Sequence, residues 1–183
     1  MKALYSVFLL TLLLGCSRKY ELNNLSPAPY AVSGLRHVRL AVFVPDEAVR
    51  DRYESRESGS KYRYIGVKTN LKNFIIGKLR PNFRKIKFFN HKRVKTEQDI
   101  GLSPSLVIKV TDDAVLEKSM ELTFSLTATT DTGVHIATSS LSAKMNFSTS
   151  SQELLEKNLK NLYDQVIAKV TTDVSAYYQK EKL

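Results

Sequence analysis

The feature that most constrains the fold is a strict two-residue alternation in the second half of the chain. From residue 121 to residue 130, apolar side chains alternate with serine and threonine, and the apolar positions are Leu122, Phe124, Leu126 and Ala128. Successive side chains of a β-strand point to opposite faces, so this pattern predicts a strand with one buried and one polar face. A strand of this kind needs a sheet and a covering layer.

The alternating strand is predicted to continue into a hairpin. Asp131-Thr132-Gly133 is typical of a tight turn. The return strand, 134–147, begins with apolar residues at even positions and continues with apolar residues at odd positions. This change of parity predicts a β-bulge near Thr138 to Ser140. A further strand is expected from Ser105 to Thr111, which is rich in valine and isoleucine.

A long amphipathic helix is predicted at the end of the chain. Ser150 and Glu153 have the spacing of a capping box. Apolar residues then recur at helical spacing as far as about Gln179, at Leu155, Leu159, Leu162, Val166, Val170 and Tyr177. A helix of roughly 28 residues is about 40 Å long, which is enough to lie across a whole sheet.

The first half of the chain is predicted to hold a strand, a helix and a second strand. Apolar residues alternate from His37 to Val44, follow helical spacing from Val67 to Leu79, and alternate again from Arg84 to Asn90. The charged stretch from Asp46 to Tyr64 is interpreted as a loop. We therefore expect an α+β fold of order β-α-β-β-β-β-α, in which an antiparallel-rich sheet has two helices packed on one face.

Positive charge is concentrated in one segment. The chain carries a formal net charge of +10, and no acidic residue lies between Glu57 and Glu97. Such a segment draws anions. The residues predicted to bind an anion or a partner are Lys68, Lys72 and Lys78 from the expected helix, and Arg84, Lys85 and Lys87 from the expected strand. The alternative is a solvated basic surface with no dedicated ligand.

Residues that carry catalysis are sparse. The three histidines, His37, His91 and His135, are scattered and have no metal-ligand spacing. The sequence also lacks a phosphate-binding glycine-rich loop and a nucleophile elbow. We therefore expect a protein that is not an enzyme and that holds neither a metal nor a cofactor.

The first sixteen residues are typical of an export signal. A lysine and an apolar run, 3–14, precede Gly15 and Cys16, which is the only cysteine. The run is too short to span a bilayer. Leu13-Leu14-Gly15-Cys16 resembles the lipobox of bacterial lipoproteins. The resemblance implies cleavage before Cys16 and acylation of that residue, by chains such as palmitate. Ser17 at the next position implies outer-membrane sorting. The alternative is an ordinary signal with an incidental cysteine.

The predicted domain organisation follows from this signal. Residues 1–15 are interpreted as a lipoprotein signal peptide and 35–183 as a single α+β domain in the periplasm. Between them, 16–34 is interpreted as the lipidated cysteine and a tether, because it has no sustained periodicity and contains Pro27 and Pro29.

The element order and two local stretches resemble a known family. The stretches are Asp51-Arg52 in the charged loop and Tyr64-Ile65-Gly66-Val67-Lys68-Thr69-Asn70 at the start of the helix. With the threonine-rich strands and the C-terminal helix, they resemble the YajG family of bacterial lipoproteins. The order is also similar to that of LptE, a lipopolysaccharide-assembly lipoprotein that plugs an outer-membrane barrel. Residues 15–20 depart from the LptE pattern, in which Gly-Trp/Phe-His-Leu is expected.

Together these patterns predict a non-enzymatic lipoprotein, lipid-anchored to the outer membrane on its periplasmic face. Its basic face is expected to make it an accessory or scaffold subunit of a cell-envelope assembly, with an envelope protein as partner. The alternative is a binding module for an anionic ligand such as lipopolysaccharide or a wall polymer. Nucleic acid is not expected as a partner, because the export signal removes the chain from the cytoplasm.

Overall fold

The computed structural model describes residues 17–22, 25–28, 30–57, 60–91, 97–113, 117–146 and 151–180. The predicted signal peptide and Cys16 lie outside these residues, as does Ser150. Within the described ranges the chain forms two helices and two sheets, one of five strands and one of three. The α+β class and the expected order of its main elements are confirmed, and the second sheet adds to the prediction.

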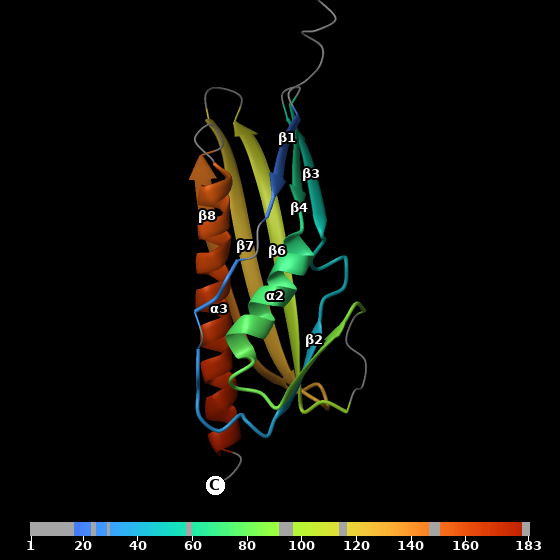
Figure 1. Ribbon diagram of the computed structural model, residues 1–183, viewed down its shortest axis with the longest axis vertical. Helices are drawn as coiled ribbons and strands as arrows, with labels where there is room; N and C mark the ends of the chain where they lie inside the picture. The colour runs from blue at the N-terminus through green and yellow to red at the C-terminus, as the bar shows by residue number, and fades with distance from the viewer. Residues whose placement is uncertain are drawn as a thin grey trace, which may run out of the picture.

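The larger sheet has the strand order β5-β2-β6-β7-β8. Its strands are β2 (Arg39–Phe43), β5 (Lys85–Phe89), β6 (Ile100–Asp113), β7 (Glu117–Thr130) and β8 (His135–Asn146). Strand β2 runs parallel to both β5 and β6. Strands β6, β7 and β8 form an antiparallel meander of long strands, which sets the long axis of the molecule (Figure 1).

The alternation in β7 predicts its two faces correctly. Leu122, Phe124 and Leu126 are fully buried, whereas the serine and threonine between them are half-buried on the other face. The predicted bulge exists, but it lies closer to the turn than 138–140. Ala128 pairs with Ala137 and Thr129 with His135, so Ile136 is the extra residue. The run of threonine and serine at 138–140 offers no apolar marker, so the sequence does not locate the change of parity within the strand.

Both helices cover one face of the larger sheet, as predicted (Figure 1). They are α2 (Val67–Leu79) and α3 (Gln152–Lys180). The Tyr163 ring of α3 lies edge-on to Phe74 of α2 and to Phe124 of β7, with centroid distances of 5.4 and 4.7 Å. This side chain is fully buried and ties the two helices to the sheet. Neither described helix has the length and apolar character needed to cross a membrane.

The helix α3 is capped one residue later than expected. The Ser151 hydroxyl accepts a hydrogen bond from the Leu154 N–H at 3.1 Å, which is the geometry of an N-cap. The spacing to Glu153 favoured the preceding Ser150, which lies outside the described residues. The buried face is as predicted from Leu155 to Val170, with Leu159 and Val166 at or near zero exposure, but at its end Tyr178 and not Tyr177 packs against the core.

The smaller sheet replaces the expected loop at 46–64. It contains β1 (Ser17–Glu21), β3 (Arg52–Glu57) and β4 (Ser60–Ile65) in the order β1-β4-β3. Its core includes Tyr20 and Tyr64, whose rings stack at 5.4 Å with at most 7% exposure. Strands β3 and β4 were missed because their buried residues are tyrosines and most of the remaining residues are charged. No alternation of apolar and polar residues is therefore visible.

The segment expected to be a tether lies against the helices instead. We call residues 25–28 and 30–33 the strap. The Tyr30 hydroxyl is 2.7 Å from Thr172 Oγ1, and the Ser175 hydroxyl donates to the Ser33 carbonyl at 2.8 Å, so both contacts are made with α3. Asn82, just after α2, accepts a hydrogen bond from Val32 N at 2.8 Å. Serine, tyrosine and asparagine form these contacts without any periodic signature in the sequence.

Candidate functional site

The structure divides the six predicted binding residues into two groups. Lys68, Lys72 and Lys78 lie on α2, in contact with neighbouring elements. Arg84, Lys85 and Lys87 are exposed, at the start of β5 and along it. The six residues therefore do not form one exposed basic face.

Lys78 is part of the protein interior. Its side chain is only 7% exposed, and its Nζ lies 2.5 Å from Asp164 Oδ1 on α3. The ammonium group also lies over the Tyr30 ring, 5.4 Å from the centroid. The Lys78 side chain thus joins α2, α3 and the strap. Its ammonium group is largely inaccessible to an external ligand.

The other two lysines of α2 also make internal contacts. Lys68 Nζ lies 2.7 Å from Asp46 Oδ1, and this hydrogen bond and the lysine charge lower the pKa of Asp46. Lys72 Nζ donates to Asn90 Oδ1 at 2.9 Å and lies 5.9 Å from the centroid of Phe88. Burial lowers the pKa of Lys72, and the nearby charge of Lys68 lowers it further. These contacts tie α2 to the ends of β2 and β5.

We call Arg84, Lys85 and Lys87 the β5 cluster. Strand β5 is an edge of the larger sheet, and its exposed lysines alternate with Ile86 and Phe88, which are half-buried. Since Lys72 of α2 lies over Phe88, the lysines of β5 point to the face of the sheet away from the helices. Among the described residues, no carboxylate is within ion-pair distance of the cluster. Its charges can therefore attract anions.

Aromatic rings continue the same face of β5. Phe89 stacks on Phe43 of β2 at 5.3 Å, and the His91 ring lies 5.4 Å from Phe89. Phe89 is half-buried and His91 is exposed. The outer face of β5 therefore carries cations at its start and aromatic rings at its end.

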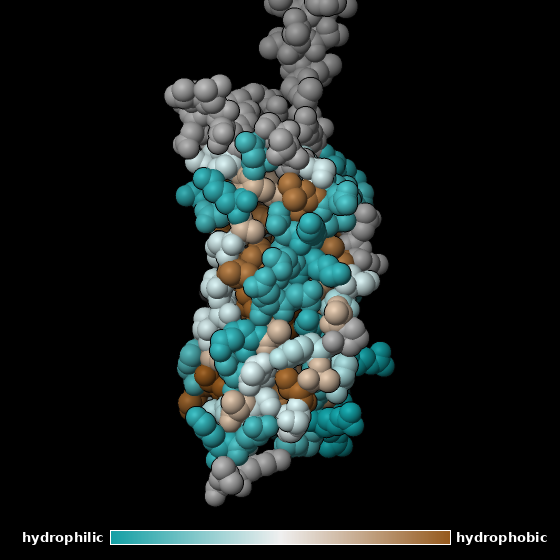
Figure 2. Space-filling view, turned by 90° about the vertical axis from the view of Figure 1, so that its left-hand side faces the viewer, coloured by the Kyte–Doolittle hydropathy of each residue, from teal (hydrophilic) through white to brown (hydrophobic). Residues whose placement is uncertain are grey.

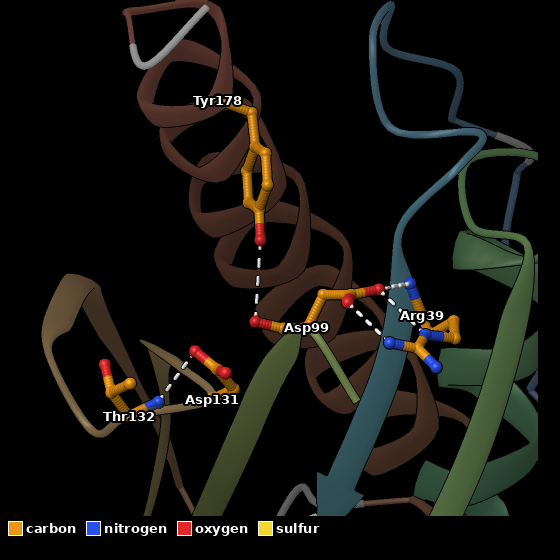
Figure 3. Close-up of polar contacts among 5 residues, drawn as sticks. All are labelled: Arg39, Asp99, Asp131, Thr132 and Tyr178. Carbon is orange, nitrogen blue, oxygen red and sulfur yellow. Dashed lines mark hydrogen bonds and ion pairs between the residues drawn. The ribbon is translucent and has the colours of Figure 1, made fainter. Parts of the chain in front are cut away.

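A polar cluster next to β5 was not predicted from the sequence. Arg39 of β2 makes a two-point contact with Asp99, with Nη2 2.9 Å from Oδ1 and Nε 3.2 Å from Oδ2 (Figure 3). The Asp99 carbonyl accepts hydrogen bonds from Tyr178 Oη at 3.5 Å and from Asp131 N at 3.1 Å. These contacts join β2, β6, α3 and the turn between β7 and β8.

The electrostatic effect of this contact is internal. The hydrogen bond from Arg39 lowers the pKa of Asp99, and Asp99 raises the pKa of Arg39. Arg39 stands directly across from Lys85 in the sheet register. The Asp99 carboxylate next to this part of the sheet is therefore already paired with Arg39. The sequence could have drawn attention to Asp99, because it is a charged residue at the start of a strand. It could not have identified the partner, Arg39, which is 60 residues away.

The three histidines are separate in the structure, as their spacing predicts. His37 lies edge-on to Tyr178, His91 beside Phe89, and His135 within 2.9 Å of Thr138 Oγ1. In the described part of the chain, no three histidine, cysteine or acidic side chains lie close enough to hold a metal ion.

A polar depression of about 390 Å³ lies on the exposed side of α3, lined by Lys157, Asn158, Lys160, Asn161 and Asp164.

Comparison with known proteins shows the fold and no more. Neither a scan against protein-family models nor a search of curated proteins found a match. The structure is similar to that of protein XCC0632 from Xanthomonas campestris, described with the family model DUF330. The TM-score is 0.58 at 9% identity, over 90% of this chain and 99% of that one.

Two further similar structures belong to proteins named as lipoproteins. They are lipoprotein GNA1162 from Neisseria meningitidis (TM-score 0.44, 11% identity, 70% of this chain and 98% of that one) and a minor lipoprotein from Acinetobacter baumannii (TM-score 0.36, 13% identity, 77% and 94%). At such identities a likeness concerns the fold alone. Membership of the YajG family stays a prediction, and what the comparisons establish is that this chain shares the fold of XCC0632.

Proposed function

We propose that the protein is a non-enzymatic lipoprotein, anchored through Cys16 to the periplasmic face of the outer membrane, that serves as an accessory or scaffold subunit of a cell-envelope assembly. The observation that carries the proposal is the β5 cluster. Lys85 and Lys87 lie on an edge strand and point to the face of the sheet that the helices leave uncovered, and Arg84 directly precedes that strand. The anchor rests on the sequence of residues 13–16.

The β5 cluster suits an acidic protein surface. Its lysines are held at fixed spacing by the pairing of β5 with β2, so the charges are presented in a defined row. Charged rows of this kind steer association and set its orientation more than they add affinity. A partner with a matching acidic row is thus the simplest ligand.

An anionic glycolipid or wall polymer is the second candidate. The observation in its favour is the aromatic pair of Phe89 and His91 on the same face of β5 as Lys85 and Lys87. Phosphorylated sugars offer anionic groups for the lysines and an apolar ring face for the aromatic side chains. Both candidates use one site and differ in what binds it.

A triple charge reversal tests the site. Arg84→Glu, Lys85→Glu and Lys87→Glu are introduced together in the full-length lipoprotein. The control is Lys157→Glu, Lys160→Glu and Lys180→Glu, which changes the net charge equally at exposed positions of α3. We expect the first variant to lose at least tenfold in the recovery of envelope proteins from detergent-solubilised membranes, and the control to keep it. An equal loss in both variants would contradict the proposed site.

The same two variants separate the candidate ligands. For this assay the unchanged protein and both variants are made without residues 1–16, so that no acyl chain holds them on the vesicles. They are co-sedimented with phospholipid vesicles that contain lipopolysaccharide, over a range of salt concentrations. A scaffold role predicts weak sedimentation that is alike in both variants. Strong sedimentation of the unchanged protein, lost only in the β5 variant, favours the glycolipid.

The anchor is tested on its own. Cys16→Ser should move the protein out of the detergent-extracted membrane fraction, because the acyl chains hold it there. Mass spectrometry of the N-terminal peptide of the unchanged protein should show the added acyl mass. Unchanged fractionation and an unmodified peptide would refute the lipid anchor. The proposal for the β5 site would not be affected by that result.

A further inference from the structure

Strand β8 is the outermost strand of the larger sheet on the side opposite β5. It is 12 residues long, from His135 to Asn146, and it pairs with β7 on one side only. Among the described residues, no strand pairs with its other side. An edge strand of this length presents a row of unpaired N–H and C=O groups that another strand can join.

The other exposed edges of this sheet are short, charged or covered. Strand β5 has five residues and carries Lys85 and Lys87, and charge of this kind discourages strand addition. The far half of β6 extends beyond β2, and there Leu106 N donates to the Ala48 carbonyl at 3.0 Å. The Tyr53 hydroxyl donates to the Leu106 carbonyl on the same edge, also at 3.0 Å.

Strand β8 is long and mostly uncharged, and among the described elements α3 packs against one face of it without pairing with its outer edge. Residues 136–143 contain no charged residue and no proline. The one lysine of the strand, Lys144, lies near its end and opposite Glu121 of β7, and His135 is its first residue. On the outer face, Thr138 and Ser142 make hydrogen bonds to Thr127 and Thr123 of β7, at 3.0 and 2.7 Å. These contacts occupy small side chains and leave the backbone edge of β8 open.

We propose that β8 pairs with β8 of a second copy of this chain, antiparallel, so that two five-stranded sheets join into one. Antiparallel pairing brings the uncharged stretch of each strand against the same stretch of the other. It also keeps the two Lys144 side chains apart, one near each end of the paired strands. Like charges directly opposite one another would destabilise the pair.

The closure of the assembly favours a second copy over a different partner. A two-fold axis pairs the two open edges with each other and satisfies both. The outer strands of the joined sheet are then the two β5 strands, which are short and carry lysine. Growth therefore stops at two copies, whereas an unpaired β8 would remain open to any extended segment.

Figure 2 shows the side of the molecule that carries this edge, where a hydrophilic band lies beside a strip of intermediate hydropathy with scattered apolar atoms. The two-fold axis is perpendicular to the sheet, so both copies turn the same face to one side. The β5 clusters then lie at the two far edges of one surface.

Cysteine cross-linking in membranes tests the pairing. The single-cysteine substitutions Thr138→Cys, Ser140→Cys and Ser142→Cys are made in the full-length chain, whose only other cysteine is Cys16. The control is Ser125→Cys, because Ser125 is the cross-strand neighbour of Ser140 on β7. Strands are spaced by about 4.8 Å, which places Ser125 of the two copies roughly 15 Å apart. Disulfides need Cα atoms within about 7 Å of each other.

The copies carry two different tags and are expressed together. We expect at least one β8 variant to give, on mild oxidation, a band of twice the monomer mass that contains both tags, at least tenfold above the Ser125→Cys band. The variant with the strongest band marks the two-fold axis. No such band in any β8 variant, or a cross-linked product that contains one tag and another protein, would overturn the proposal.

An edge-blocking variant gives a second measurement. Ser140→Lys with Ser142→Lys places charges on the edge strand where the copies meet. In detergent, light scattering should give twice the protein mass for the unchanged chain and the single mass for this variant, with melting temperatures that agree. A single mass for the unchanged chain would also overturn the proposal.

Discussion

The lysines of α2 and the cations of β5 come from one continuous basic segment, yet they have opposite environments. Lys68 and Lys78 are at most 8% exposed and lie in ion pairs with Asp46 and Asp164. Lys85 and Lys87 are exposed, and no carboxylate in the described part of the chain pairs with them. Both groups appear in the sequence as the same run of positive charge.

The difference shows that charge in a sequence has two uses. A lysine that faces a helix or a loop can bury its aliphatic stem and hold a carboxylate, and it then contributes to the fold. A lysine on the free face of an edge strand has neither contact, so its charge is available to a ligand or protects the edge. Substitutions in the two groups should therefore separate stability from binding.

The largest effect is expected at Lys78. Lys78→Ala removes the packed stem and leaves Asp164 without its cation, so we expect the free energy of unfolding to fall by about 2 to 4 kcal/mol. Denaturant unfolding measures the change. The double variant Lys78→Met with Asp164→Leu should recover much of the loss, since a well-packed apolar pair can replace a buried ion pair. A Lys78→Ala protein as stable as the unchanged one would remove the distinction between the groups.

A smaller effect is expected at Lys68. Its stem is buried, but the side chain of its partner Asp46 is 85% exposed, so solvent screens the ion pair. Lys68→Ala should lower the free energy of unfolding by about 1 to 2 kcal/mol, mainly through lost packing. Lys68→Met keeps the stem and should cost much less. Equal losses of unfolding free energy in Lys68→Ala and Lys68→Met would show that the charge of Lys68, and not its aliphatic stem, stabilises the fold.

The pair of Arg39 and Asp99 should make stability depend on pH in the acid range. Because Arg39 lowers the pKa of Asp99 in the folded protein, the pair stabilises the fold above the unfolded-state pKa of about 3.9. That contribution is lost as the pH falls through the lower folded-state pKa. Asp99→Asn should therefore flatten the decline in stability below about pH 4. Thermal unfolding at several pH values measures this, and an unchanged decline would contradict it.

The smallest effects on stability are expected in the β5 cluster. Lys85→Ala and Lys87→Ala remove exposed side chains, so each should change the free energy of unfolding by less than about 0.5 kcal/mol. The same denaturant measurement applies. A loss above 1 kcal/mol at either position would place that lysine among the structural cations and weaken the proposed binding site.

Local patterns predicted most of the elements and the position of the basic segment. The alternation in β7 and the helical spacing in α3 hold because each repeats over many residues and needs only one buried face. The same reasoning missed β1, β3 and β4, where the buried positions are occupied by tyrosine among charged residues. It also missed the contact between Arg39 and Asp99, which are brought together only by the pairing of distant strands.

The sequence by itself determined the α+β order of the main elements, the buried face of the long strands and the position of the basic segment, because periodicity and charge are local properties. Only the tertiary structure decided which cations are available. Lys78 and Asp164 are 86 residues apart, and the packing of α2 on α3 makes them partners. The fold also left β8 as an open edge, since the edge of a sheet depends on the order of all its strands.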